Sequence, residues 1–135
     1  MSSDLINARI SEYLGLHKVS IENLKWNTPC EPEPTIVITD KNRNFCRIFT
    51  VSRGEESSMD FNYPKNYCGD LNAIHGAIAT LNEDQKDYFL DTLSTVIYGN
   101  KWPEDWMNKE WEKLINATAA QRAEAFLRVI GKWEE

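Results

Sequence analysis

Apolar residues near the start of the chain recur at the spacing of an α-helix. They are Ile6, Ile10, Tyr13 and Leu14. A serine, Ser2 or Ser3, stands where the N-cap of such a helix is expected. Gly15 follows the last apolar residue, a position where glycine ends many helices. The sequence therefore predicts an N-terminal helix that stops at Gly15.

Two short segments, 35–39 and 45–51, are rich in β-branched and aromatic residues and predict strands. Residues 40–44 between them are Asp, Lys, Asn, Arg and Asn, a composition typical of turns. Together they predict an antiparallel hairpin over residues 35–51. Because an isolated hairpin is only marginally stable, we expect a further strand or a layer of helices to complete it.

The segments on either side of this hairpin show no clear period. Residues 16–34 have only a hint of alternation, and their path stays open. Three prolines within 27–34 favour an extended surface connector there. Residues 53–60 are polar and predict a mobile loop, and 61–69 predict an ordered loop. The aromatic residues of that second loop, which we expect to pack onto the core, are Phe61, Tyr63 and Tyr67.

From residue 70 to the end the pattern is helical. Asp70 is a suitable N-cap for a helix over 71–81. Asn82 and Gln85 have the spacing of a capping box for a second helix, which Gly99 ends. The apolar residues expected to face inward in these two helices are Leu71, Ile74, Ile78, Leu81, Phe89, Leu90, Leu93, Val96 and Ile97.

Two more helices complete the pattern. Pro103 suits the first turn of a third helix, and Thr118 with Gln121 forms a capping box for a last helix that ends before Gly131. Their apolar positions are Met107, Trp111, Leu114, Ile115, Ala123, Phe126, Leu127 and Ile130. We predict one α+β domain over 1–135, with a small antiparallel sheet packed against an N-terminal helix and three or four C-terminal helices.

Charge and composition exclude several classes of function. The 135 residues carry 15 Lys and Arg against 21 Asp and Glu, a net charge of −6. This balance disfavours direct binding to nucleic-acid phosphates or to anionic membranes. We expect no membrane span and no signal peptide, because the apolar runs are too short. The odd number of cysteines, Cys30, Cys46 and Cys68, argues against a disulfide framework and favours the cytoplasm.

Few residues have a spacing that points to chemistry. The two histidines, His17 and His75, lack the short spacings of a zinc site, and no glycine-rich phosphate loop is present, so no metal or cofactor is expected. Asn72 and His75 share a helical face beside Asp70. We interpret this trio as the lining of a small-ligand or weakly hydrolytic pocket, or as plain hydrogen-bond anchors. Cys68 is one candidate nucleophile for such hydrolysis.

Tryptophan is concentrated in one short segment. Trp102, Trp106 and Trp111 fall within ten residues. On a single helix Trp102 and Trp106 would align four residues apart, while Trp111 would join the apolar stripe of that helix. Tryptophan is enriched at binding hot spots, so these rings are a candidate partner surface or dimer seam. The alternative is that they cover the core.

Segments 67–81 and 117–135 resemble a loose group of small phage and prophage proteins of unassigned function. Segment 10–15 is also similar to the opening helix of that group. The matching residues are Tyr67, Asp70, Leu71, Asn72, Ala73, His75, Ala117, Thr118, Ala119, Gln121, Arg122, Ala123, Glu124, Ala125, Leu127 and Arg128. The group is similar to the phage α-β-α sandwich domains. The resemblance implies a small sheet between helices and no catalytic residue, and Gly76 departs from its pattern, which has Glu there.

These observations predict a non-catalytic protein-binding module. A phage or prophage accessory protein of this kind would act on a host factor or defence complex in the host cytoplasm, with the acidic surface facing a basic partner. Self-association through the tryptophan segment is a second form of the same hypothesis. The alternative function is the small-ligand or weakly hydrolytic pocket at Asp70, Asn72 and His75.

Overall fold

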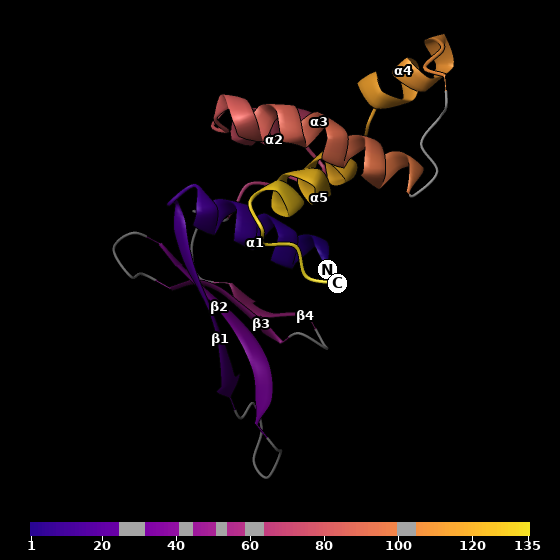
Figure 1. Ribbon diagram of the computed structural model, residues 1–135. Coiled ribbons are helices and arrows are strands. Elements are labelled where there is room, and N and C mark those ends of the chain that lie inside the picture. Colours follow the sequence, from indigo (N-terminus) through magenta and orange to yellow (C-terminus); the bar gives the residue numbers. More distant parts are fainter. Residues whose placement is uncertain (25–31, 41–44, 51–53, 59–63, 100–104) are drawn as a thin grey trace. The chain divides into compact units, whose positions relative to one another are not determined.

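The computed structural model (Figure 1) describes residues 1–24, 32–40, 45–50, 54–58, 64–99 and 105–135. The protein is α+β, as predicted. The chain divides into two compact units. One unit comprises residues 1–10 and 66–135 and contains most of the helices. The other comprises residues 11–65 and contains the sheet.

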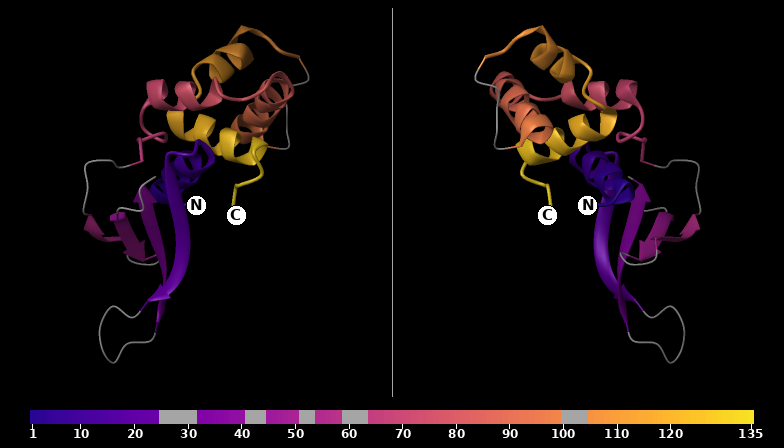
Figure 2. Two further views of the ribbon diagram at one scale, coloured as in Figure 1. Left: turned by 90° about the vertical axis from the view of Figure 1, so that its left-hand side faces the viewer. Right: turned by 90° about the vertical axis from the view of Figure 1, so that its right-hand side faces the viewer.

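The sheet unit has four antiparallel strands in chain order (Figures 1 and 2). They are β1 (His17–Leu24), β2 (Glu33–Asp40), β3 (Phe45–Thr50) and β4 (Gly54–Ser58). β2 and β3 form the predicted hairpin, with Val37 opposite Ile48. β1 and β4 extend it on its two edges, so further strands complete the hairpin, as its marginal stability requires.

Cross-strand apolar pairs form the buried part of this sheet. Val19 of β1 pairs with Ile38 of β2, and Ile36 of β2 pairs with Phe49 of β3. These four side chains are buried. Such pairs are the units that stabilise a sheet, and their alternation with exposed positions fixes the register. A β-bulge shifts the register between Ile38 and Thr39.

Two sequence-based expectations for this unit are wrong. Strand β4 occupies 54–58, where a mobile loop is predicted, and β2 begins at Glu33, inside the predicted connector. Gly-Glu-Glu-Ser-Ser has no β-branched residue, so its strand arises from backbone pairing with β3 rather than from propensity. Strand β1 lies in the stretch whose path the sequence left open.

Helix α1 (Ser3–Tyr13) begins and ends close to the predicted positions. The backbone nitrogen of Leu5 donates to Ser2 Oγ over 3.3 Å, which identifies Ser2 as the residue that caps this helix. Gly15 ends it with φ of +74°, a conformation that favours glycine. The buried residues of α1 include Leu5, Ile6, Ala8 and Ile10.

The helical unit contains α2 (Leu71–Ile78), α3 (Glu83–Tyr98), α4 (Asn108–Ile115) and α5 (Ala119–Val129). α5 packs against α2 and α3, and α4 packs against α3. The two predicted capping boxes, Asn82–Gln85 and Thr118–Gln121, are both present. The core of this unit includes Ile74, Phe89, Leu93, Ala123, Phe126 and Leu127. Tyr67 is also buried, as predicted, whereas Phe61 and Tyr63 lie outside the described residues.

Three details of the helical prediction are corrected. α2 ends at Ile78 and not at residue 81. Leu71 and Leu90 are about half exposed rather than inward-facing, because helical spacing marks apolar positions without showing whether a neighbour covers them. α4 begins only at Asn108, so Trp106 precedes the helix and does not lie on it. Pro103 lies outside the described residues.

Candidate functional site

Asp70 has a structural role. Its Oδ1 accepts hydrogen bonds from the backbone nitrogens of Asn72 (2.9 Å) and Ala73 (3.5 Å), which makes it the N-cap of α2. An N-cap carboxylate satisfies amide groups that have no partner within the helix. Asp70 and Asn72 are both exposed on the first turn of α2, and neither lines a described cavity.

His75 is different, because it lines a hollow of about 390 Å³ on the helical unit, which we call the His75 hollow. Its other lining residues come from α2, α3 and α5, and are Ile78, Ala79, Lys86, Phe89, Leu90 and Arg122. The floor is apolar, and the three polar side chains are all basic. Of the predicted trio, His75 alone lines one of the described cavities, and the sequence analysis named neither Lys86 nor Arg122 as a site residue.

Cys68 is a poor nucleophile in this structure. Burial raises the pKa of its thiol, and the nearby Asp4 carboxylate acts in the same direction. A hydrogen bond from the Ser3 side chain lowers the pKa and opposes these two effects. The Sγ also lies 3.9 Å from the carbonyl oxygen of Ser3, to which the thiol donates. An activated cysteine needs a lowered pKa, so the geometry gives no support to hydrolysis at Cys68.

Three aromatic rings form a cluster where α3 meets α4. Tyr98 and Trp106 contact edge to face with centroids 5.7 Å apart, and Trp106 and Trp111 lie 4.8 Å apart. The Tyr98 hydroxyl donates to the backbone oxygen of Glu110 over 2.9 Å, which ties α3 to α4. Desolvation, and then the charge of Glu110, raise the pKa of Tyr98. Trp106 is half-buried between its two aromatic neighbours.

The outer face of α4 carries an uncovered apolar stripe. Trp111 and Ile115 are four residues apart and share one face of α4, and Met107, four residues before Trp111, is the N-cap residue of this helix. The exposed fractions of Met107, Trp111 and Ile115 are 65%, 49% and 70%. We call these three residues the α4 stripe. Trp106 thus packs against Tyr98 and Trp111, whereas Trp111 is exposed on the surface. The sequence left open which tryptophans are buried and which are exposed. Trp102, the third predicted tryptophan, lies outside the described residues.

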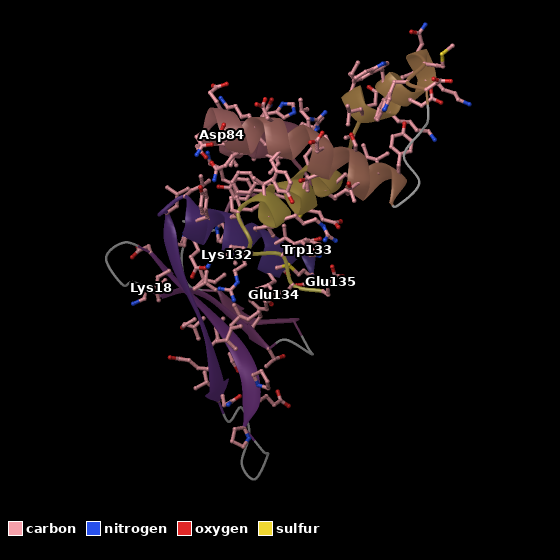
Figure 3. All side chains as sticks on the ribbon, in the orientation of Figure 1. Lys18, Asp84, Lys132, Trp133, Glu134 and Glu135 are labelled. Atoms are coloured by element: carbon pink, nitrogen blue, oxygen red, sulfur yellow. The ribbon has the colours of Figure 1, made fainter. Side chains whose placement is uncertain are left out.

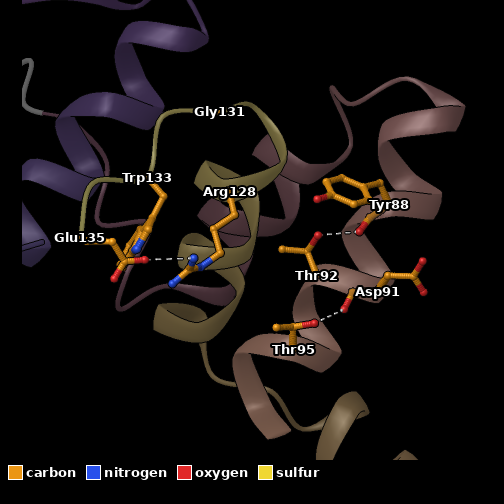
Figure 4. Close-up of a pocket in the computed structure, with 8 residues that line it drawn as sticks. All are labelled: Tyr88, Asp91, Thr92, Thr95, Arg128, Gly131, Trp133 and Glu135. Carbon is orange, nitrogen blue, oxygen red and sulfur yellow. Dashed lines mark hydrogen bonds and ion pairs between the residues drawn. The ribbon is translucent and has the colours of Figure 1, made fainter. Parts of the chain in front are cut away.

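A second hollow, of about 440 Å³, lies between α3 and the tail that follows α5 (Figures 3 and 4). Arg128 dominates it: its guanidinium bonds Glu124 at 2.7 Å, approaches Glu135 at 3.4 Å and lies 5.0 Å from the centroid of the Trp133 ring. Two carboxylates therefore balance one cation. This arrangement holds the tail against α5, although Trp133 Nε1 is a buried donor without a hydrogen-bond partner among the described residues.

A buried polar pair in the sheet unit was missed by sequence reasoning. Ser11 Oγ and His17 Nδ1 share a hydrogen bond, and both residues are buried. Because Ser11 is completely inaccessible, a substrate cannot reach its hydroxyl, and the pair serves to join α1 to β1. The only available signal was the short separation of Ser11 and His17 across the Gly15 turn.

The described residues contain neither a helix that could span a membrane nor a group of side chains that could bind a metal ion. No helix there is both long and apolar enough to cross a bilayer. Nor do three or more His, Cys, Asp or Glu side chains gather there in a way that could hold a metal ion.

Comparisons with models of protein families, with curated proteins and with solved structures gave no significant match. The assignment of function consequently rests on the residues and geometry of this chain.

Proposed function

We propose that this protein is a non-catalytic protein-binding module whose contact surface centres on the α4 stripe. We infer a phage or prophage accessory protein that acts in the host cytoplasm on a host factor or defence complex, in line with the resemblance of its α2 and α5 segments. The observation that carries the proposal is the exposure of Trp111 and Ile115 on one face of α4 and of Met107 at its N-cap.

The energetics favour a partner for this stripe. Each of these side chains, when an interface covers it, stabilises a complex by about 1–2 kcal/mol through the loss of apolar area exposed to water. A short helix with no buried residue makes little use of such side chains for folding. Trp111 is also held in place by Trp106 at 4.8 Å, so its ring loses little freedom on binding.

The charge of the chain indicates the kind of partner. With a net charge of −6, encounter with a basic protein surface is favoured over encounter with another acidic one. Trp111 lies between exposed charges of both signs on α4, Lys109, Glu112 and Lys113, which suit a polar rim around an apolar centre. Association of two copies of this chain is the competing form of the proposal.

Affinity capture with matched variants tests the proposal. The tagged chain is incubated with host-cell lysate, and captured proteins are quantified by mass spectrometry for wild type, Trp111→Ala and Leu71→Gln. Leu71 is 48% exposed on α2 and is the control for an exposed apolar side chain elsewhere. A partner retained by wild type and Leu71→Gln but lost by Trp111→Ala supports the proposal. Equal capture by all three contradicts it.

Sedimentation of the purified chain distinguishes self-association. If the α4 stripe joins two copies, wild type sediments as a dimer at micromolar concentration and Trp111→Ala as a monomer. If wild type is a monomer, the partner that covers the α4 stripe is a different protein. If Trp111→Ala is still a dimer, the two copies contact each other away from the α4 stripe.

A further inference from the structure

The His75 hollow combines an apolar floor with a rim that carries two cationic side chains, Lys86 and Arg122. Phe89 is buried at its base, and Leu90, 54% exposed, forms one wall. Its polar lining residues are His75, Lys86 and Arg122, and no acidic residue lines it. In a chain with 21 Asp and Glu against 15 Lys and Arg, a cavity lined by Lys86 and Arg122 and by no acidic residue runs against the overall composition.

We propose that the His75 hollow binds a small organic anion with an apolar body, such as an aromatic or branched carboxylate or sulfonate. The apolar body would lie over Phe89 and Leu90, and the anionic group would face the basic rim. The volume of about 390 Å³ falls within the range of small-molecule sites, roughly 300–1,000 Å³. This site is on α2, α3 and α5 and does not depend on the α4 stripe.

Arg122 is already oriented for such a ligand. Its Nε donates to the carbonyl oxygen of Ala117 over 3.1 Å, and one terminal nitrogen donates to that of Ile115 over 2.8 Å. A guanidinium has five N–H donors, so these two bonds fix the plane of the group while its charge and further donors remain for an anion. Its rotameric freedom is largely lost before any ligand arrives, which lowers the cost of binding.

Lys86 adds a second, adjustable cation. Its ammonium lies 4.0 Å from a carboxylate oxygen of Glu83, whose side chain is 93% exposed. Water screens such a long surface pair strongly, so a desolvated ligand anion can compete with it. His75, exposed on the last turns of α2, completes the rim as a further hydrogen-bond donor.

Titration of the full chain with 8-anilinonaphthalene-1-sulfonate tests the proposal, with fluorescence as the readout of affinity and backbone NMR shifts as the readout of location. We expect shifts centred on His75, Lys86 and Leu90, and affinity that falls as salt is added. N-phenyl-1-naphthylamine, which has a similar aromatic body without the sulfonate, should bind more weakly by about fivefold or more.

Variants with matched controls complete the test. Lys86→Glu and Leu90→Gln should each weaken binding of the sulfonate by about fivefold or more, whereas Lys132→Glu and Leu71→Gln should change it less than about twofold. Lys132 and Leu71 are exposed and line no described cavity. Absence of binding, shifts centred on another surface, equal affinity of the neutral probe, or equal effects of hollow and control variants would overturn the proposal.

Discussion

At the scale of single residues, Cys68 shows how surroundings decide chemistry. Burial and the Asp4 carboxylate raise the pKa of its thiol more than the contact with Ser3 lowers it. The folded protein therefore keeps this group protonated at pH values where the unfolded thiol has begun to ionise. Because the thiolate is the reactive form, Cys68 should be a slow nucleophile in the folded chain.

Site-resolved alkylation measures this effect. With iodoacetamide at pH 8, we expect Cys68 in the folded chain to react several-fold more slowly than the same residue in the urea-unfolded chain. The folded rate should still be rising at a pH where the unfolded rate has levelled off, because the folded pKa is the higher one. Asp4→Asn, which removes a charge that raises the pKa, should accelerate the folded reaction. A folded rate equal to the unfolded rate would refute this account.

Ser11 and His17 provide the second residue-scale prediction. Ser11→Ala removes the hydroxyl and leaves His17 Nδ1 buried without that partner, which costs about 1–3 kcal/mol of the free energy of unfolding. Ser94 is the matched control: it is also buried, but its hydroxyl donates to Leu90 O, within its own helix. Ser94→Ala should therefore cost less, since such local bonds compete with the helix ladder. Urea denaturation compares the two, and a smaller loss for Ser11→Ala would show that the pair contributes little.

Single residues also show how far the candidate sites could be predicted from the sequence. Asp70 was correctly predicted as an N-cap, whereas a binding role for Trp106 and Trp111 stays a prediction. Which ring is exposed depends on how Tyr98 packs against Trp106, a contact between residues eight apart whose geometry no local pattern encodes. Arg122 was missed for the same reason, because its place beside the His75 hollow depends on how α5 packs.

At the scale of elements, the helices were easier to predict than the strands. Caps act within four residues, so Asn82 with Gln85 and Thr118 with Gln121 specify where α3 and α5 begin. Strands β1 and β4 are edge strands that depend on pairing with β2 and β3. An edge strand has fewer neighbours to satisfy, so a polar segment such as 54–58 can fill the position without a recognisable pattern.

The capping box of α5 yields an element-scale prediction. Gln121 N donates to Thr118 Oγ1 over 3.1 Å, and Thr118 N donates to Gln121 Oε1 over 2.9 Å. Thr118→Ala should lower the free energy of unfolding by about 1 kcal/mol, and Thr118→Ser, which keeps the hydroxyl, by much less. α5 carries the largest part of the helical core, so the loss should appear in the main unfolding transition. If both variants unfold at the same urea concentration, the capping bond contributes nothing measurable.

At the scale of the whole molecule, the residues that form the buried core and those of the exposed α4 stripe lie on different elements. The sheet unit and the α2–α3–α5 core hold the fold, while α4 contributes no buried residue and carries the α4 stripe. The sequence predicted the α+β class from its two kinds of periodicity. It did not predict the division into two units, because that division follows from long-range contacts such as those that pair β1 with β2 and α3 with α5.

The measurement that tests the central claim most directly is the dissociation constant of a captured partner, determined by calorimetry for wild type, Ile115→Gln and Leu71→Gln. Ile115 and Leu71 are isomeric exposed side chains, 70% and 48% exposed, on different helices. The account predicts that Ile115→Gln weakens binding by about tenfold, as expected for losing about 1.4 kcal/mol of apolar contact, and that Leu71→Gln has no effect. Equal dissociation constants for wild type and Ile115→Gln would contradict a binding surface on the α4 stripe.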